Sequence, residues 1–308
     1  MVHVSADVAV KRRVSSLDIR LVLAALSAAG AITRVVPRYP AGEVIARFAG
    51  CLWFLFARHA REAVRDNLRH VLQREPTRLE ILRVFQHGAL NYWDTFALPH
   101  ATYQQLIELV DLHGLEHIEA ARSEGRGVIC AGPHLGSVVF VSQVLPALGY
   151  PVVGLVEPFD PPEVFDFFTR QRQALGTRLW PAGTSGVRQL LLSLRRNEVV
   201  GLVTDRDITG NGPIIPFFGA MTHFPDGAAA LSLRTGAPIL IAVAVRKAHG
   251  RFDGWIEPLP PTERTGDSKQ DALRLTRAVA ERLEYYVANH PEQWTVFQRR
   301  WDRVSSGA

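Results

Sequence analysis

Two clusters of polar residues in this 308-residue chain have side chains suited to acid–base chemistry. The first is Ala131-Gly-Pro-His134-Leu-Gly-Ser137, and the second is Thr204-Asp205-Arg206-Asp207. Histidine is the usual general base near neutral pH, and a carboxylate can orient the imidazole and stabilise its protonated form. Loops are commonly polar without any catalytic role, so each cluster alone is weak evidence. The two clusters together favour a base–carboxylate pair.

Both clusters directly follow short apolar runs of the kind that form strands buried on both faces. The strand candidates span residues 127–131, 151–156, 199–203 and 238–245. Helical stretches lie between and after them, at residues 137–148, 162–175, 185–196, 227–235 and 268–289. This alternation predicts an α/β fold with a mainly parallel sheet flanked by helices, and ligands bind beyond the carboxyl ends of such strands. Ser137 is expected to cap the helix that follows His134.

Residues 1–112 have a different texture and are predicted to form a helical N-terminal region ahead of an α/β core at residues 113–308. One helix is expected over residues 76–93. Two apolar runs, residues 21–32 and 48–57, each fall short of the roughly 20 apolar residues that cross a bilayer. Their arginine flanks and Trp53 are typical of helices that lie in a membrane interface. The alternative is that both helices simply pack on the rest of the protein.

Composition and missing motifs exclude several classes of protein. With 47% hydrophobic and 21% charged residues, the chain has material for a sizeable core and is not a disordered protein. Two cysteines are too few for a disulfide scaffold or a zinc cluster. The sequence lacks a Gly-x-Ser-x-Gly elbow, the glycine-rich phosphate loops and a His-Glu-x-x-His pattern. Its arginine-rich segments lack the interleaved aromatic residues of a nucleic-acid platform, although the net charge is +5.

Several segments, taken in order, resemble one family. They are Arg65-Asp-Asn-Leu-Arg-His-Val71, Gly132-Pro-His-Leu-Gly136, Gly154-Leu-Val-Glu157-Pro, Phe168-Thr-Arg-Gln-Arg172-x-x-x-Gly176, Thr204-Asp-Arg-Asp-Ile208, Pro216-Phe-Phe-Gly219 and Pro291-Glu-Gln-Trp294. This ordered set resembles the bacterial lysophospholipid acyltransferase superfamily over about residues 20–301, in the branch of lipid A late acyltransferases and phosphatidylinositol mannoside acyltransferases.

The resemblance implies a fold like that of glycerol-3-phosphate acyltransferases. It implies a peripheral protein on the cytoplasmic face of the plasma (inner) membrane, attached through its N-terminal helices, so that residues 1–112 become a membrane-associating region. The implied reaction transfers a fatty acyl chain from a thioester, acyl-CoA or acyl carrier protein, to a hydroxyl of a membrane glycolipid or lysophospholipid. Neither a metal nor any other cofactor is expected, and nucleic acid is not an expected partner.

The resemblance makes His134 the general base. The family signature places an acidic residue five positions later, but this chain has Val139 there. The phosphatidylinositol mannoside branch also uses an acid at the strand end that matches Asp205. Because neighbouring strands lie about 5 Å apart, Asp205 reaches His134 if their strands are adjacent. We therefore predict that Asp205, and not Asp207, supports His134.

Four further residues are predicted to bind substrate: Glu157, Arg172, Arg206 and Gly136. Backbone N–H groups near Gly136 are expected to hold the oxyanion of the reaction. Arg172 is expected to contact a phosphate of the acceptor or carrier, with an exposed helix arginine as the alternative. Two alternatives to the transferase remain at this point: a catalytically silent lipid-binding or scaffold protein, and an acyl-thioester hydrolase.

Overall fold

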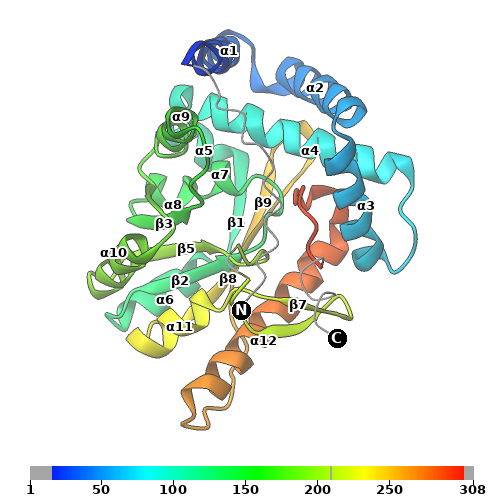
Figure 1. The fold of residues 1–308 in the computed structure, drawn as a ribbon. Helices are drawn as coiled ribbons and strands as arrows, with labels where there is room; N and C mark the ends of the chain where they lie inside the picture. Colours follow the sequence, from blue (N-terminus) through cyan, green and yellow to red (C-terminus); the bar gives the residue numbers. More distant parts are fainter. Residues whose placement is uncertain (1–15, 209, 302–308) are drawn as a thin grey trace.

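The computed structural model describes residues 16–208 and 210–301 and has a seven-stranded sheet at its centre (Figure 1). From edge to edge the strands are β1 (Val110–His113), β9 (Phe252–Pro258), β8 (Ile239–Arg246), β2 (Val128–Gly132), β5 (Val199–Val203), β3 (Val152–Val156) and β4 (Arg178–Pro181). Each neighbouring pair is parallel except β8 and β9, which are antiparallel. The predicted α/β class, with a mainly parallel sheet flanked by helices, is confirmed.

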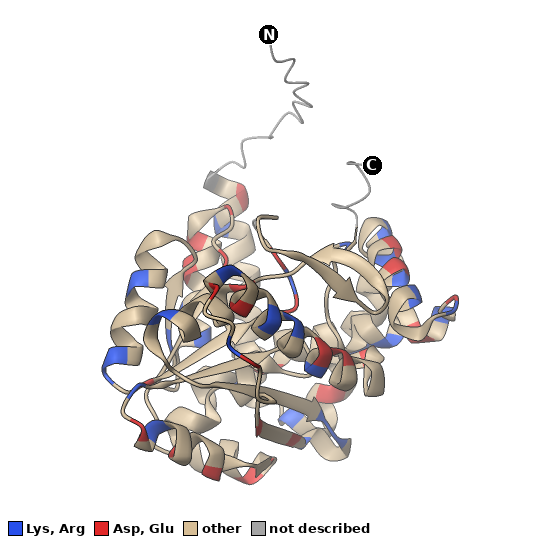
Figure 2. Ribbon diagram, turned by 90° about the horizontal axis from the view of Figure 1, so that it is seen from below, with Lys and Arg blue, Asp and Glu red and all other residues tan. Residues whose placement is uncertain are grey.

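The central strands are buried on both faces, which explains their unbroken apolar sequences. Ile129 and Ala131 of β2 belong to a core shared with α10 (Thr184–Arg195), α11 (Gly227–Thr235) and α12 (Ser268–Asn289). Val128 and Cys130 point the other way and pack with α6 (Leu115–Ser123). Strands β2, β3 and β5 contain no charged residue, and the ribbon in Figure 2 is coloured for charged residues mainly on the surrounding helices and loops.

The strands β1, β4 and β9 escaped prediction because they lack an unbroken apolar run. β4 is an edge strand whose residues are mostly exposed, and β9 alternates buried Phe252 and Ile256 with less buried positions such as Asp253 and Glu257. A separate antiparallel hairpin of β6 (Ile214–Phe217) and β7 (Ala220–His223) was also not predicted.

The helix predicted over residues 137–148 is wrong, because the structure has two short helices, α7 (Val138–Val141) and α8 (Val144–Ala147). Pro146 has no N–H to donate to the Ser142 carbonyl and its ring crowds that carbonyl in a continuous helix. The Ser142 carbonyl accepts instead from Thr177 Oγ1 at 3.3 Å, and the Ser142 hydroxyl donates to the Val139 carbonyl at 3.0 Å. The helix predicted at 162–175 ends early, as α9 (Pro162–Arg172).

The N-terminal helices are α1 (Ser16–Val35), α2 (Glu43–Phe56), α3 (Arg58–Leu72) and α4 (Arg78–Ala97), followed by α5 (Tyr103–Leu109). The helix predicted over residues 76–93 is α4, which starts with a capping box between Thr77 and Glu80. The apolar run at 21–32 lies on α1 and the run at 48–57 lies on α2 except for its last residue; both helices contact α4 and lie above it in Figure 1.

Within residues 16–208 and 210–301 we find no individual helix with both the length and the apolar composition of a membrane span. Residues 38–56 and 58–72 meet these criteria only when taken as a pair, and that pair is bent by 99°.

A buried ion-pair cluster connects this helical region to the sheet. Asp94 of α4 is 1% exposed; its carboxylate accepts from Arg38 Nε at 2.8 Å and from Arg246 at the end of β8. Arg38 also donates to the carbonyl of Gly250 and lies 4.5 Å from the ring centroid of Phe140. Burial alone would raise the pKa of Asp94, but the two guanidinium groups outweigh it and hold that pKa below its usual range.

Replacing Asp94 with asparagine is expected to lower the free energy of unfolding by about 3–5 kcal/mol, because two largely buried arginines lose their counter-charge. Urea unfolding measures the change. The matched control is Asp111→Asn, whose carboxylate pairs with Arg251 at 2.8 Å on the surface and should cost less than about 1 kcal/mol. Equal losses in the two variants would contradict the role of the buried cluster.

Candidate active site

The sheet places the two polar clusters side by side. β2 and β5 are adjacent and parallel, with Gly132 opposite Val203 at their carboxyl ends. The Thr204 N–H donates to the Gly132 carbonyl at 2.8 Å, so the strands remain paired where the chains leave the sheet. The adjacency on which the predicted contact depended is therefore present, and both loops open at the edge where α/β proteins bind ligands.

His134 and Asp205 are joined by two hydrogen bonds. His134 Nδ1 lies 2.7 Å from Asp205 Oδ1, and the His134 backbone N–H donates to Asp205 Oδ2 at 2.9 Å. The imidazole is 37% exposed, whereas the carboxylate is 0% exposed. The predicted contact between His134 and Asp205 is confirmed. A carboxylate acceptor at Nδ1 places the ring proton there and leaves the lone pair on Nε2, which is the form that accepts a proton.

Asp205 is ionised although it is fully buried. Burial alone would raise its pKa, but the attraction of His134 and hydrogen bonds from His134 and Trp294 lower it to about 2. The Trp294 indole Nε1–H donates to Oδ2 at 2.7 Å, and Arg300 Nε donates to the Asp205 backbone carbonyl at 2.6 Å. The carboxylate thus keeps its negative charge at neutral pH and faces the imidazole in a fixed orientation.

The segment after α12 holds the His134 loop in place. Thr295 N–H donates to the His134 carbonyl at 2.9 Å, and the Gly136 N–H donates to the Gln293 carbonyl at 3.1 Å. The Gln293 side chain accepts from the backbone N–H of Arg246 at 2.7 Å and donates to the backbone carbonyl of Arg246 at 3.0 Å. This segment was not predicted to have a role, although Pro291–Trp294 was one of the motifs of the resemblance. Its place in that motif set was the available signal.

Gly136 has a structural reason to be glycine. Its φ is +60°, and a Cβ atom there would lie 2.2 Å from the Ala244 carbonyl oxygen. Its N–H donates to the Gln293 carbonyl at 3.1 Å, and the role of backbone N–H groups near Gly136 in holding an oxyanion stays a prediction. Ser137 precedes α7 but its side chain makes no capping hydrogen bond, so the expected cap is wrong. The break of that helix after four residues leaves little for a cap to stabilise.

Val139, which stands where the family signature has an acidic residue, lies in an apolar environment. It packs against the cluster that contains Leu98, Leu106 and Phe140. Val139 is partly buried, and a carboxylate there would lie against apolar side chains, which is unfavourable without a partner. The carboxylate at the imidazole comes from Asp205 instead.

Glu157 and Arg206 are brought together and form an ion pair at the ends of the adjacent strands β3 and β5. Arg172 lies at the end of α9, 5.8 Å from the ring centroid of Phe168. It is partly buried, its Nε has no hydrogen-bond partner among the described residues, and burial lowers its pKa. The alternative of an exposed helix arginine is therefore wrong. Asp207 accepts the Gly212 N–H at 2.8 Å within its own loop.

Comparison with known proteins decides the family. Residues 10–303 match the family described as bacterial lipid A biosynthesis acyltransferase. The chain belongs to this family. It is 30% identical over 249 residues to a phosphatidylinositol mannoside acyltransferase of Mycolicibacterium smegmatis, covering 78% of this chain and 79% of that protein. It is 27% identical over 183 residues to a lipid A biosynthesis acyltransferase of Haemophilus influenzae, covering 59% of this chain and 55% of that protein.

Membership of the lipid A biosynthesis acyltransferase family makes this protein an acyltransferase of lipid biosynthesis. A third relative, the lipid A biosynthesis palmitoleoyltransferase of Escherichia coli, is 26% identical over 196 residues, or 62% of this chain and 61% of that protein. The family resemblance expected from the ordered motifs is confirmed.

Proposed function

We propose that this acyltransferase moves a fatty acyl chain from an acyl thioester to a hydroxyl of a membrane glycolipid or lysophospholipid, with His134 as general base. The observation that carries the proposal is the His134–Asp205 pair at the carboxyl edge of the sheet. The names of the relatives support a glycolipid acceptor. Acyl-CoA and acyl carrier protein are the two donors that the chemistry allows.

The pair accounts for each proton in the reaction. Nε2 of His134 takes the proton of the acceptor hydroxyl as its oxygen bonds to the thioester carbonyl carbon. The buried carboxylate of Asp205 stabilises the imidazolium that forms. The carbon–sulfur bond of the intermediate then breaks, and the imidazolium returns the proton to the leaving thiolate. The products are an ester and a free thiol.

Glu157, Arg206 and Arg172 are proposed to contact the substrates. Arg206 already has Glu157 as a partner, so it presents a guanidinium held in place at the end of β5. Arg172 has a buried Nε–H without an acceptor, which a substrate oxygen would satisfy. Arginine binds phosphate oxygens through parallel hydrogen bonds, as phosphoglycolipids and phosphopantetheine both allow.

Mass spectrometry of the lipids after incubation tests the function. The purified protein is supplied with acyl-CoA or acyl carrier protein and, in separate reactions, with phosphatidylinositol mannosides, lipid A precursors and lysophospholipids. Transfer gives an acceptor whose mass has increased by one acyl group. Release of free fatty acid in place of that product would identify a thioester hydrolase, and unchanged thioester would identify a silent member of the fold.

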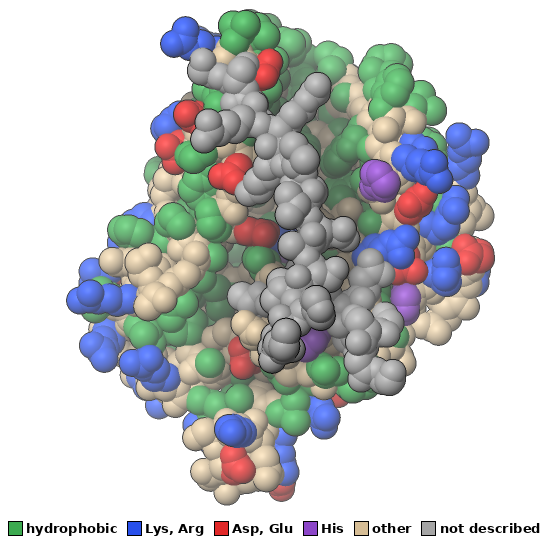
Figure 3. All heavy atoms as spheres, in the orientation of Figure 1, with side chains coloured by type: hydrophobic (Ala, Val, Ile, Leu, Met, Phe, Trp, Pro, Cys, Tyr) green, Lys and Arg blue, Asp and Glu red, His purple; other side chains and the backbone are tan. Residues whose placement is uncertain are grey.

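We further propose that α1 and α2 seat the protein on the membrane surface. Large apolar side chains are exposed along both helices, among them Phe48 at 63% and Phe56 at 84%. Figure 3 shows hydrophobic side chains over α1 and α2 at the top of the molecule. An exposed apolar face beside arginines is typical of a helix that lies in the interface.

Replacing Phe48 and Phe56 with aspartate is expected to weaken binding to phospholipid vesicles by about tenfold or more, because burying each phenylalanine gains roughly 1.5–3 kcal/mol. Vesicle flotation measures the binding. Met221→Asp together with Tyr285→Asp is the control, since both side chains are exposed on β7 and α12. The assignment fails if both double variants bind vesicles as the wild type does.

A further inference from the structure

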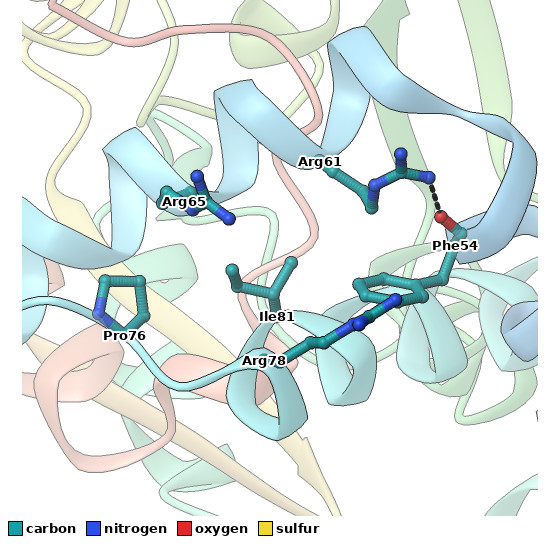
Figure 4. A pocket seen from close by; sticks show the side chains of 6 residues that line it. All are labelled: Phe54, Arg61, Arg65, Pro76, Arg78 and Ile81. Atoms are coloured by element: carbon teal, nitrogen blue, oxygen red, sulfur yellow. Dashed lines mark hydrogen bonds between the residues drawn. The ribbon is translucent and has the colours of Figure 1, made fainter.

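A second site lies where α2, α3 and the start of α4 meet, outside the acyl-transfer machinery. A cavity of about 270 Å³ opens there (Figure 4). Its lining consists of Phe54, Arg61, Arg65, Pro76, Arg78 and Ile81. Three of these six side chains are arginines and none is acidic. The concentration of one sign of charge in a small cavity is the feature to be explained.

The carboxylates of this region are engaged elsewhere. Arg58 pairs with Glu62 at 3.0 Å, and Arg69 pairs with Glu75 at 2.7 Å. Within the described residues, Arg65 and Arg78 have neither an ion-pair partner nor a hydrogen-bond acceptor for their guanidinium groups.

Contacts of Arg61 and Arg78 with α2 form the wall of the cavity. Arg61 donates to the carbonyls of Phe54 and Leu55 at the end of α2, the latter at 2.7 Å. Arg61 and Arg78 lie 5.4 and 5.6 Å from the Phe54 ring centroid. Figure 4 shows Arg65 extending from α3 and Arg78 from the start of α4, on opposite sides of Ile81. These contacts hold Arg61 and Arg78 against Phe54 in the cavity wall, and Arg65 lines the same cavity.

Arg65 and Arg78 are both exposed, so water screens part of their charge, but two electrostatic features favour an anion in the cavity. Three neighbouring guanidinium groups repel one another, and the cavity lining contributes no carboxylate. Arg78 also occupies the first turn of the 20-residue helix α4, where the positive end of the helix dipole disfavours a cation. A bound anion relieves both costs. The planar forks of arginine match the oxygens of a phosphate group in particular.

The place of the cavity on the surface points to the source of the phosphate. The exposed apolar side chains of α2 end with Leu55 and Phe56, and α3 turns away by 99° directly after them. In Figure 3, blue side chains gather over α3 on the right, below the hydrophobic side chains over α2. The cavity therefore lies at the boundary between an apolar and a basic surface, which is the level of headgroups when an apolar helix lies in a membrane.

We propose that the cavity formed by Arg61, Arg65 and Arg78 binds the phosphate of an anionic phospholipid headgroup. The site rests on the membrane seating of α2 included in the proposed function. It adds a lipid-specific contact to a surface that otherwise binds by apolar burial and diffuse charge. It orients the protein by fixing the end of α2 at headgroup level.

Binding of the full chain to vesicles tests the site. The double variant Arg65→Gln, Arg78→Gln is compared with Arg58→Gln, Arg69→Gln, which removes the same charge from the same region at arginines that already have partners. On phosphatidylcholine vesicles containing phosphatidylglycerol, the first variant is expected to bind more than about 30-fold more weakly than wild type, because it loses the direct phosphate contacts in addition to the diffuse attraction of about 1 kcal/mol for each basic residue near an anionic surface. The second variant loses several-fold less. Equal losses would overturn the site, because diffuse charge then explains all the binding.

Three further measurements test whether the site needs an anionic lipid, whether it needs the guanidinium groups, and whether free phosphate binds there. On pure phosphatidylcholine vesicles the Arg65→Gln, Arg78→Gln variant should bind like wild type. The variant Arg65→Lys, Arg78→Lys keeps the charge but not the forks, and it should recover only part of the binding. Competition by millimolar inorganic phosphate as strong as that by phosphatidylglycerol vesicles would overturn the lipid assignment in favour of a free phosphate.

Acyl transfer to detergent-dispersed acceptor keeps this inference distinct from the proposed function. The Arg65→Gln, Arg78→Gln variant should retain wild-type turnover there, since no membrane is needed. A loss of turnover confined to acyl carrier protein as donor, with unchanged vesicle binding, would overturn the lipid site and identify a docking site for an acidic protein. Absence of transfer by the wild type would contradict the proposed function and leave the vesicle comparison intact.

Discussion

Replacing His134 with alanine is expected to lower the rate of acyl transfer by about 10²–10⁴-fold, the usual contribution of a general base. The fold should survive, because the imidazole is 37% exposed and the loop is held through its backbone by Thr295. Alanine removes the imidazole from the buried Asp205 carboxylate and leaves Trp294 as its only side-chain donor among the described residues, so a second variant is needed. Asparagine places an amide N–H near the position of Nδ1 and has no counterpart of Nε2.

His134→Asn should therefore keep the hydrogen bond to Asp205 and lose the rate. Turnover is measured with the acyl-acceptor pair identified by mass spectrometry, and circular dichroism reports the fold. His117→Ala, a substitution of a partly buried histidine on α6, is the control and should leave the rate unchanged. A folded His134→Ala variant with near-wild-type turnover would show that His134 is not the base.

Asp205→Asn is expected to have an effect of similar size, about 10²–10⁴-fold in turnover, through the imidazole rather than through the substrate. Asp205 accepts from the His134 ring, the His134 N–H and the Trp294 indole, and an asparagine amide cannot accept from all three. The neutral amide no longer stabilises the imidazolium or keeps the ring proton on Nδ1. Asp207→Asn should matter much less, because Asp207 accepts the Gly212 N–H within its own loop.

Trp294→Phe separates the charge of Asp205 from its orientation. It removes one hydrogen-bond donor but retains the carboxylate and most of the buried aromatic surface. Turnover should fall by about tenfold, because one lost hydrogen bond to a charged group is worth about 1.5 kcal/mol. Rates are compared at neutral pH, where a pKa of about 2 keeps the wild-type carboxylate ionised. Equal activity of Asp205→Asn and Asp207→Asn, both folded, would reject Asp205 as the supporting acid.

Much of the core was predictable from local sequence. The apolar runs that became β2, β3, β5 and β8 are long and uninterrupted because these strands are buried on both faces, and few other structures bury such runs. Helix α12 was predicted with its observed bounds, since Asp267 caps its start. The position of His134 and Asp205 directly after strands was also visible, and with it the edge of the sheet at which they lie.

Other features depended on contacts between residues distant in the chain. The order of the strands, which makes β2 and β5 neighbours, is set by packing of the whole sheet and not by any local pattern. Trp294 lies 89 residues from Asp205 along the chain, and only the folded protein brings its indole to the carboxylate. Pro146 allows a break between α7 and α8, but the Thr177 hydroxyl that satisfies the Ser142 carbonyl there comes from 35 residues along the chain.

The sequence by itself therefore determined the class of fold, the family and the two residues at the strand ends, because these follow from periodicity and from local motifs. Only the tertiary structure decided that the strands before His134 and Asp205 are neighbours, how Gln293, Trp294 and Thr295 hold the loop, and where arginines converge on a cavity. The physical reason is that burial and close approach, which fix charge and orientation, arise when separate elements pack together. Arg65 and Arg78 illustrate this: each is an ordinary surface arginine in the sequence, and they line one cavity only because α3 and α4 meet there.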